Sequence, residues 1–200
     1  LTYMETSSSS TSELVTELIQ YYQDEVELTS LEATALYAGI VVDTKNFAVQ
    51  TGVRTFDAAA YLRRCGADPE IVRSIFSSDF ATVRLKSSLL AKATIEDGVA
   101  MLDCGDLKEN ATMLAAQLAD MLINLNNVRA SFTFYELAEK TVGISARSKG
   151  EVNVQRVMEV LGGGGHSNVA GAQLKGLTIE EAQEVVRKAL EEIPEEKESE

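Results

Sequence analysis

The stretch that decides the fold is ISARSKGEVNVQRVMEVLGGGGHSNVAGAQ, residues 144–173. Its first residues complete TVGISARS (141–148), which predicts a strand, and the apolar spacing of VNVQRVMEVL (152–161) predicts a helix. GAQLKG (171–176) predicts a further strand. Because strands and helices alternate here, this part of the chain favours an α/β unit.

Four consecutive glycines, Gly162, Gly163, Gly164 and Gly165, follow that helix and run into His166, the single histidine of the chain. Glycine reaches positive φ cheaply and lets a ligand approach the backbone, and successive N–H groups can form a concave anion site. A helix N-terminus just after the loop would add partial positive charge. The loop therefore predicts a phosphate site to which His166 donates. The structural alternative is a helix end and tight turn beside a structural histidine, although one glycine suffices for that turn.

Arg147 ends the predicted strand shortly before the glycines. A guanidinium is suited to two parallel hydrogen bonds with a phosphate. The alternative is an arginine that ends a strand in solvent, and spacing alone favours it.

The remaining pattern divides the chain into a helical part and an α/β part. Ser10 with Glu13 and Thr29 with Glu32 have capping-box spacing, and each pair precedes a helical stripe. One further helix is predicted with Thr55 as its N-cap, and another begins at Asp68 and Pro69. Two later helices are predicted with Asn110 and Thr178 as their N-caps. GVAMLDCG (98–105) and ASFTFYEL (130–137) predict strands. We expect a helical part over residues 1–82, a connecting helix over 83–96, an α/β part over 97–192 and an acidic tail over 193–200.

The apolar run GIVVD ends at Asp43. This pattern predicts a short buried strand, and a carboxylate at the tip of such a strand often faces a cleft, where it can ligate a hard divalent cation. The alternative is an aspartate that caps the next turn. Lys45, Asn46 and Arg54 follow as a polar cluster that could meet an anion.

Composition excludes several classes of protein. Acidic residues number 31 and basic residues 18, so the net charge of −13 argues against binding of long nucleic acids but leaves room for a small anion. Cys65 and Cys104 are far apart, which indicates neither a disulfide framework nor a paired-cysteine metal site and favours a reducing cytosol. The chain starts at Leu1 without a signal-peptide pattern and has no apolar run of membrane-spanning length. We therefore expect a soluble fragment of a longer protein.

Two separated stretches together resemble one family. GIVVDTKNFAVQTGVRTFDAA resembles the last metal-ligand motif of the DHH phosphoesterases, and residues 144–173 resemble the DHHA1 domain that follows it. The first stretch is more similar to the membrane-linked bacterial cyclic di-AMP phosphodiesterases than to the oligoribonucleases and phosphoadenosine-phosphate phosphatases of the same family.

The resemblance implies the C-terminal part of a DHH domain followed by an α/β DHHA1 domain. It also implies a two-metal manganese site that activates water and hydrolyses cyclic di-AMP to pApA. Asp43 would be a metal ligand, and Arg147, residues 162–165 and His166 would belong to the substrate pocket. Lys45, Asn46 and Arg54 would lie near the metal cleft. The parent protein would be a homodimer held at the bacterial membrane by upstream segments, with this part facing the cytoplasm.

The family's other metal ligands, including Asp-His-His itself, are absent from this sequence. We therefore expect the 200 residues alone to be catalytically inactive. Two alternatives stay open: a relative that hydrolyses short RNA or phosphoadenosine phosphate, and a non-catalytic nucleotide-binding module.

Overall fold

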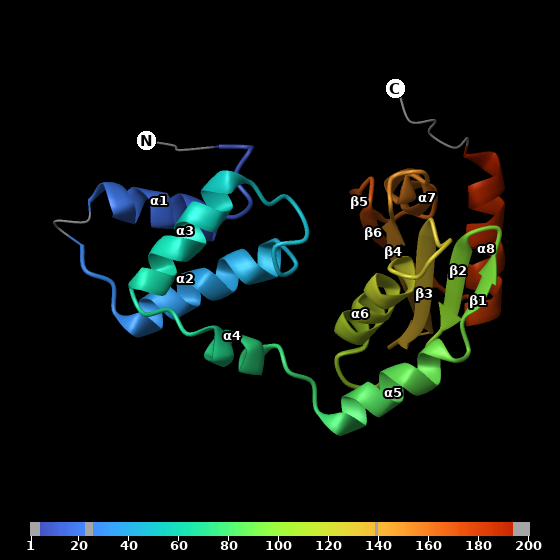
Figure 1. Ribbon diagram of the computed structural model, residues 1–200. Helices are drawn as coiled ribbons and strands as arrows, with labels where there is room; N and C mark the ends of the chain where they lie inside the picture. The colour runs from blue at the N-terminus through green and yellow to red at the C-terminus, as the bar shows by residue number, and fades with distance from the viewer. Residues whose placement is uncertain (1–4, 23–25, 139, 194–200) are drawn as a thin grey trace. The chain divides into compact units, whose positions relative to one another are not determined.

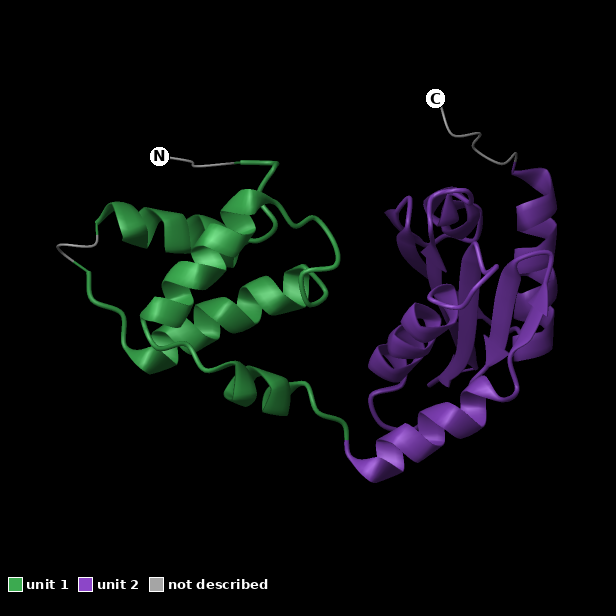
Figure 2. Ribbon diagram, in the orientation of Figure 1, with its two compact units in different colours: residues 1–78 green, residues 79–200 purple. Residues whose placement is uncertain are grey.

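A computed structural model describes residues 5–22, 26–138 and 140–193. The chain divides into two compact units, residues 1–78 and residues 79–200, which Figure 2 shows in different colours. Each unit has its own buried apolar cluster, so each is described by itself.

Unit 1 is helical, as its sequence predicts, and its core lies between helices that meet through small side chains. Its helices are α1 (Thr11–Tyr21), α2 (Ser30–Asp43), α3 (Val53–Arg64) and α4 (Pro69–Ile75). Its fully buried residues include Ala33 and Ile40 on α2 and Ala58 and Leu62 on α3. The predicted capping box of Thr29 and Glu32 is confirmed at the start of α2. Asp68 and Pro69 open α4, as predicted.

Two expectations for unit 1 are wrong. The run GIVVD is not a strand but the last turn of α2, because its apolar side chains continue a helix that the capping box has already started. Thr55 is not the N-cap of α3. Gly52 is the N-cap, and Thr55 lies three residues further on, where its Oγ1 accepts a hydrogen bond of 3.1 Å from the Gly52 N–H.

Unit 2 is an α/β unit built on one mixed sheet (Figure 1). It starts with α5 (Phe80–Leu90), and its six strands lie in the order β1-β2-β3-β4-β6-β5. The strands are β1 (Thr94–Glu96), β2 (Val99–Asp103), β3 (Ala130–Leu137), β4 (Thr141–Ser148), β5 (Gly164–His166) and β6 (Val169–Lys175). Only the β2–β3 pair is parallel among these neighbours, and the predicted pairing of residues 130–137 with 141–148 is confirmed as antiparallel.

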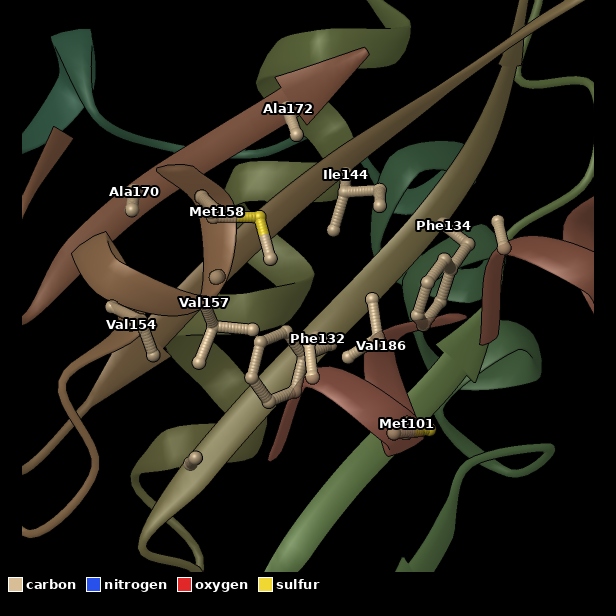
Figure 3. Close-up of a cluster of buried hydrophobic side chains, with 14 of the residues drawn as sticks. Met101, Phe132, Phe134, Ile144, Val154, Val157, Met158, Ala170, Ala172 and Val186 are labelled. Carbon is tan, nitrogen blue, oxygen red and sulfur yellow. The ribbon is translucent and has the colours of Figure 1, made fainter. Parts of the chain in front are cut away.

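The two faces of the sheet are covered by different helices. Phe132 and Ile144 point to one face, where they pack with Met158 of α7 (Val154–Val160) and Val186 of α8 (Ile179–Glu192), as Figure 3 shows. The alternate residues point to the other face, where Thr133 Oγ1 donates a 2.9 Å hydrogen bond to a carbonyl of α6 (Ala111–Ile123). Unit 2 therefore has an α7–α8 face and an α6 face.

One further boundary differs from the prediction. The connecting helix ends at Leu90, and Thr94–Glu96 form β1 instead of a last helical turn. Asp97 and Gly98, with φ of 49° and 76°, make the two-residue turn of a hairpin between β1 and β2. Positive φ at both positions is typical of the tight turns that join antiparallel strands, and Asp-Gly is a preferred sequence for them.

Candidate functional site

The first of the four glycines ends α7. Gly162 has a φ of 75°, its N–H donates to the Glu159 carbonyl at 3.0 Å, and the next N–H, that of Gly163, donates to the Met158 carbonyl at 2.8 Å. This pair of bonds is the Schellman ending of a helix, which favours glycine in the left-handed position. The structural alternative therefore explains Gly162.

No helix N-terminus follows the glycines, so that part of the prediction is wrong. Residues 164–166 form β5, the edge strand, which pairs with β6 through a two-residue turn at Ser167 and Asn168. A hairpin forms here instead of a helix because β6 lies alongside and provides antiparallel hydrogen-bond partners for the backbone of residues 164–166. A backbone that continued into a helix would leave the β6 edge unpaired.

Close packing against β6 explains two more of the glycines. A Cβ at Gly163 would lie 2.6 Å from the Ala172 Cβ, and one at Gly165 would lie 2.5 Å from the Ala170 Cα. Both distances are shorter than any real carbon–carbon contact. The fold therefore excludes side chains at these positions.

Neither a left-handed backbone nor close packing requires a glycine at position 164. A Cβ at Gly164 would meet no heavy atom of the described residues within 4 Å, and its φ lies outside the left-handed region. The residue is exposed on the edge strand. The space above Gly164 is therefore open, and its bare backbone is available to a ligand.

The register places the predicted ligand residues on one face. Arg147 of β4 pairs with Val169 of β6, which pairs with His166 of β5. Directly opposed residues on neighbouring strands project to the same face of a sheet. Gly164 belongs to the next row of that face, opposite Gly171. With strands about 4.8 Å apart, Arg147 and His166 lie about 10 Å apart across the sheet.

This is the α6 face, because the Arg147 side chain reaches that helix. Its Nε donates a 2.8 Å hydrogen bond to Oδ1 of Asp120, and its Nη1 donates to the Ala146 carbonyl at 3.0 Å. The Arg147 side chain is only 12% exposed. Arg147 is therefore an ion-paired, largely buried side chain, and the alternative of an arginine that ends a strand in solvent does not hold.

Beside Arg147 this face is accessible. His166 is exposed, Val169 between it and Arg147 is 45% exposed, and Gly164 in the next row is exposed. A positive guanidinium, an imidazole, an apolar side chain and bare backbone thus lie on one face of the sheet, where all but the largely buried guanidinium are exposed. We call these residues the β5–β6 face: Arg147, Gly164, His166, Val169 and Gly171.

In unit 1, Asp43 is the last residue of α2 and is exposed. The three residues after Thr44 are left-handed, with φ of 47° at Lys45, 60° at Asn46 and 64° at Phe47. Each such non-glycine residue costs about 1–2 kcal/mol. Strain of this kind is kept where the surrounding structure fixes it, and it clusters at functional sites.

Thr44 holds this turn together. Its side chain is fully buried, its Oγ1 accepts from the Phe47 N–H at 2.9 Å and donates to the Ile40 carbonyl at 2.6 Å, and its carbonyl accepts from Ala48 and Val49. The turn opens onto a groove of about 960 Å³ that lies wholly within unit 1. Lys45, Asn46 and Arg73 line it together with apolar side chains of α2 and α4.

Arg54 is not among the residues that line this groove. Its Nε and Nη2 donate to the two carboxylate oxygens of Glu17 at 2.7 and 2.6 Å, and this pairing raises the pKa of Arg54. The structure therefore brings Lys45 and Asn46 to one groove and directs Arg54 toward α1.

The described residues do not fit a two-metal centre by themselves. Within them, no group of three or more His, Cys, Asp or Glu side chains is placed to hold a metal ion. Cys104 offers no ligand, because burial raises the pKa of its thiol to about 12. Asp43 has the chemistry of a hard-cation ligand, and it would have to be joined by ligands from outside these residues.

Sequence reasoning missed Asp120, Val169 and Gly171, which the fold places beside the predicted residues. Val169 and His166 share a face only because a two-residue turn sets the register of β5 on β6. Asp120 lies 27 residues from Arg147 in the chain, and no local pattern indicates their contact.

Comparison with known proteins agrees with this architecture. Residues 99–193 match the DHHA1 domain family, so this part of the chain is a DHHA1 domain. It is 49% identical over 191 residues to the cyclic-di-AMP phosphodiesterase GdpP of Geobacillus thermodenitrificans, a match that covers 95% of this chain and 29% of that protein.

Two further relatives are informative. The bifunctional oligoribonuclease and PAP phosphatase NrnA of Thermus thermophilus is 32% identical over 191 residues, which covers 93% of this chain and 57% of that protein. The crystal structure of an exopolyphosphatase-related protein from Bacteroides fragilis superposes with a TM-score of 0.83 at 26% identity. That match covers 96% of this chain and 59% of the other. The predicted order of a helical part followed by an α/β DHHA1 domain is confirmed.

Across the part of the chain that the structure describes, every helix is too short or too polar to cross a bilayer.

Proposed function

We propose that this chain is the C-terminal part of a metal-dependent phosphodiesterase that hydrolyses cyclic di-AMP to pApA, and that its β5–β6 face holds the nucleotide. The 49% identity to a cyclic-di-AMP phosphodiesterase supports the substrate class. The observation that carries the proposal is the placement of Arg147, Gly164 and His166 on one face of the sheet.

Each group on this face has a stated role. The Arg147 guanidinium donates to phosphate oxygens, for which its planar fork is suited. The bare backbone at Gly164 lets a phosphate approach without a Cβ in the way, and His166 donates from the neighbouring row of the same face. Val169 offers apolar contact to the nucleotide's base or ribose. Gly162, Gly163 and Gly165 take part by shaping the edge strand.

For unit 1 we propose a place beside the metals of the whole protein. Asp43 would supply one metal ligand, which fits its exposed carboxylate at the end of α2. Lys45 and Asn46 would meet the anionic substrate near the metals, and Arg54 would act there only after leaving Glu17. Manganese, the homodimer and attachment to the bacterial membrane with this part in the cytoplasm belong to the proposed parent protein. Because the described residues do not form a two-metal centre, we expect the 200 residues alone to bind nucleotide without hydrolysing it.

Isothermal titration calorimetry with pApA tests this proposal on the chain itself. Wild type should bind, and Arg147→Ala and His166→Ala should each weaken binding about 10-fold or more, since each removes a charge-assisted or polar contact to phosphate. Binding that neither substitution weakens would contradict the proposal. Turnover of cyclic di-AMP by the chain with manganese would contradict the expected inactivity.

A second function is favoured by one specific observation, the 32% identity to a bifunctional oligoribonuclease and PAP phosphatase. Titration with 3′-phosphoadenosine 5′-phosphate in parallel with pApA separates the two. If the parent protein hydrolyses cyclic di-AMP, pApA should bind more tightly than 3′-phosphoadenosine 5′-phosphate, because its second nucleotide adds contacts. Equal or tighter binding of the mononucleotide would favour the second function.

A further inference from the structure

The partner of Arg147 on α6 is an acidic side chain with no role so far. Asp120 Oδ1 accepts from Arg147 Nε at 2.8 Å, and the Asp120 side chain is 38% exposed against 12% for Arg147. The contact joins α6 to β4 at the border of the β5–β6 face. A carboxylate beside a proposed phosphate site is unexpected, because it repels the ligand.

The geometry gives a reason for it. Arg147 has Nε held by Asp120 and Nη1 held by the Ala146 carbonyl, so two of its three nitrogens are fixed to the protein. A free arginine side chain samples many rotamers and loses that freedom when it binds a ligand. With Nε and Nη1 engaged, the plane of the guanidinium is set before any ligand arrives. Such preorganisation improves affinity by reducing the ordering needed at binding.

We infer that Asp120 is the positioning residue of the nucleotide site: it fixes the Arg147 guanidinium toward the β5–β6 face and does not itself contact the ligand. This inference rests on the proposed function, in which Arg147 binds phosphate. It assigns to α6 a part in ligand binding.

Asp120 has two opposing effects on an anion, and two substitutions separate them. Asp120→Ala removes both the acceptor for Arg147 Nε and the negative charge. Asp120→Asn keeps one acceptor oxygen for Arg147 Nε, removes the charge and replaces the second oxygen with an NH2 group. If positioning dominates, the alanine variant binds pApA about 10-fold more weakly than wild type, and the asparagine variant binds at least as tightly as wild type.

A control for the loss of charge and a double-mutant cycle between Asp120 and Arg147 complete the design. Glu136→Ala removes one exposed carboxylate from β3, five residues beyond the Ser131 that pairs with Arg147, and it should change affinity less than about 2-fold. In the Arg147→Ala background, Asp120→Ala should cause no further loss, because a positioning residue acts only through its partner. The Arg147 Nε–H signal in NMR spectra of the unliganded chain should be protected from solvent exchange in wild type and lose that protection in Asp120→Ala.

The outcomes are distinguishable. If Arg147→Ala weakens pApA binding but Asp120→Ala does not, the inference is overturned and the proposed function stands. An asparagine variant that binds as weakly as the alanine variant would likewise overturn it. If Arg147→Ala leaves binding unchanged, the proposed function fails and the inference fails with it.

Discussion

Gly164 lies directly opposite Gly171 in the ladder between β5 and β6, so two neighbouring strands present bare backbone at the same row of one face. A Cβ at Gly171 would lie 2.9 Å from the Ile144 carbonyl oxygen, which gives that glycine a packing reason. A Cβ at Gly164 would lie in open space with respect to the described residues. The contrast separates a glycine required by the fold from one that the fold leaves unexplained.

Gly164→Val should abolish detectable pApA binding while leaving stability nearly unchanged. The valine side chain occupies the space above the edge strand that a phosphate would need. Its Cβ would meet no heavy atom of the described residues within 4 Å, and β-branched residues are favoured in strands. Calorimetry with pApA measures the binding, and unfolding in urea measures the stability. A variant that binds like wild type would show that Gly164 is not a point of ligand approach.

Gly163→Ala is the matched opposite case. Its Cβ would collide with Ala172, and the backbone of α7 or β6 must shift to admit it. Overpacking of this kind destabilises by about 1–3 kcal/mol. Urea unfolding should show that loss for Gly163→Ala and a change below about 0.5 kcal/mol for Gly164→Ala, whose position is exposed. Similar stabilities for the two alanine variants would contradict the assigned packing.

Glu13 should make unit 1 sensitive to acid. Its carboxylate is almost fully buried, and burial alone raises its pKa. Hydrogen bonds from the side chains of Ser9 and Thr55 and from the Ser9 N–H outweigh this effect, so the pKa of Glu13 is lowered from 4.5. A lowered pKa gives stability that is fully present above pH 4.5 and is lost as pH falls through the folded-state pKa.

Glu13→Gln therefore should be less stable than wild type at pH 7, with a difference that shrinks as pH falls below about 4.5. Thermal unfolding of both proteins across pH 3–7 gives the comparison. A stability difference that stays constant over this range would contradict the role assigned to the ionised carboxylate.

Thr44→Val should destabilise unit 1 by about 1–3 kcal/mol, because it leaves the partly buried Phe47 N–H without the hydroxyl that accepts from it. Thr16→Val is a matched control. Thr16 is equally buried on α1, and its hydroxyl only donates to the Ser12 carbonyl one turn earlier. Thr16→Val should lower the free energy of unfolding, measured with urea, by less than half as much as Thr44→Val does. Equal losses of stability in the two variants would argue against Thr44 as the support of the strained turn.

Much of the fold could be predicted from local signals. Thr29 with Glu32 and Asp68 with Pro69 mark helix starts because capping depends on nearby residues only. The run ending at Asp43 misled because a short apolar, β-branched segment fits a strand as well as a helix end, and packing of Ile40 against α3 decides between them. Asp97 and Gly98 form a preferred hairpin-turn pair that can be recognised in the sequence, and it argues against continuing the helix to residue 96.

The sequence points to individual candidate residues of the site but not to their arrangement. Alternation along β4 places Arg147 on the face opposite to Ile144, and that much follows from sequence. The pairing of Arg147 with Val169 and of Val169 with His166 depends on strand order, and β6 pairs with β4 while β5 lies at the edge. The sequence offers two roles for the glycine run, a phosphate loop or a helix end with a tight turn. The structure uses its members separately, for a helix end, for close packing and for open backbone.

The most direct test is an NMR titration of the labelled chain with pApA, followed at the backbone amides. The account predicts that the largest shifts fall on the β5–β6 face, at Gly164, His166, Val169 and Arg147, with smaller shifts on the α7–α8 face. Shifts concentrated on the α7–α8 face, or a spectrum that pApA leaves unchanged, would contradict it.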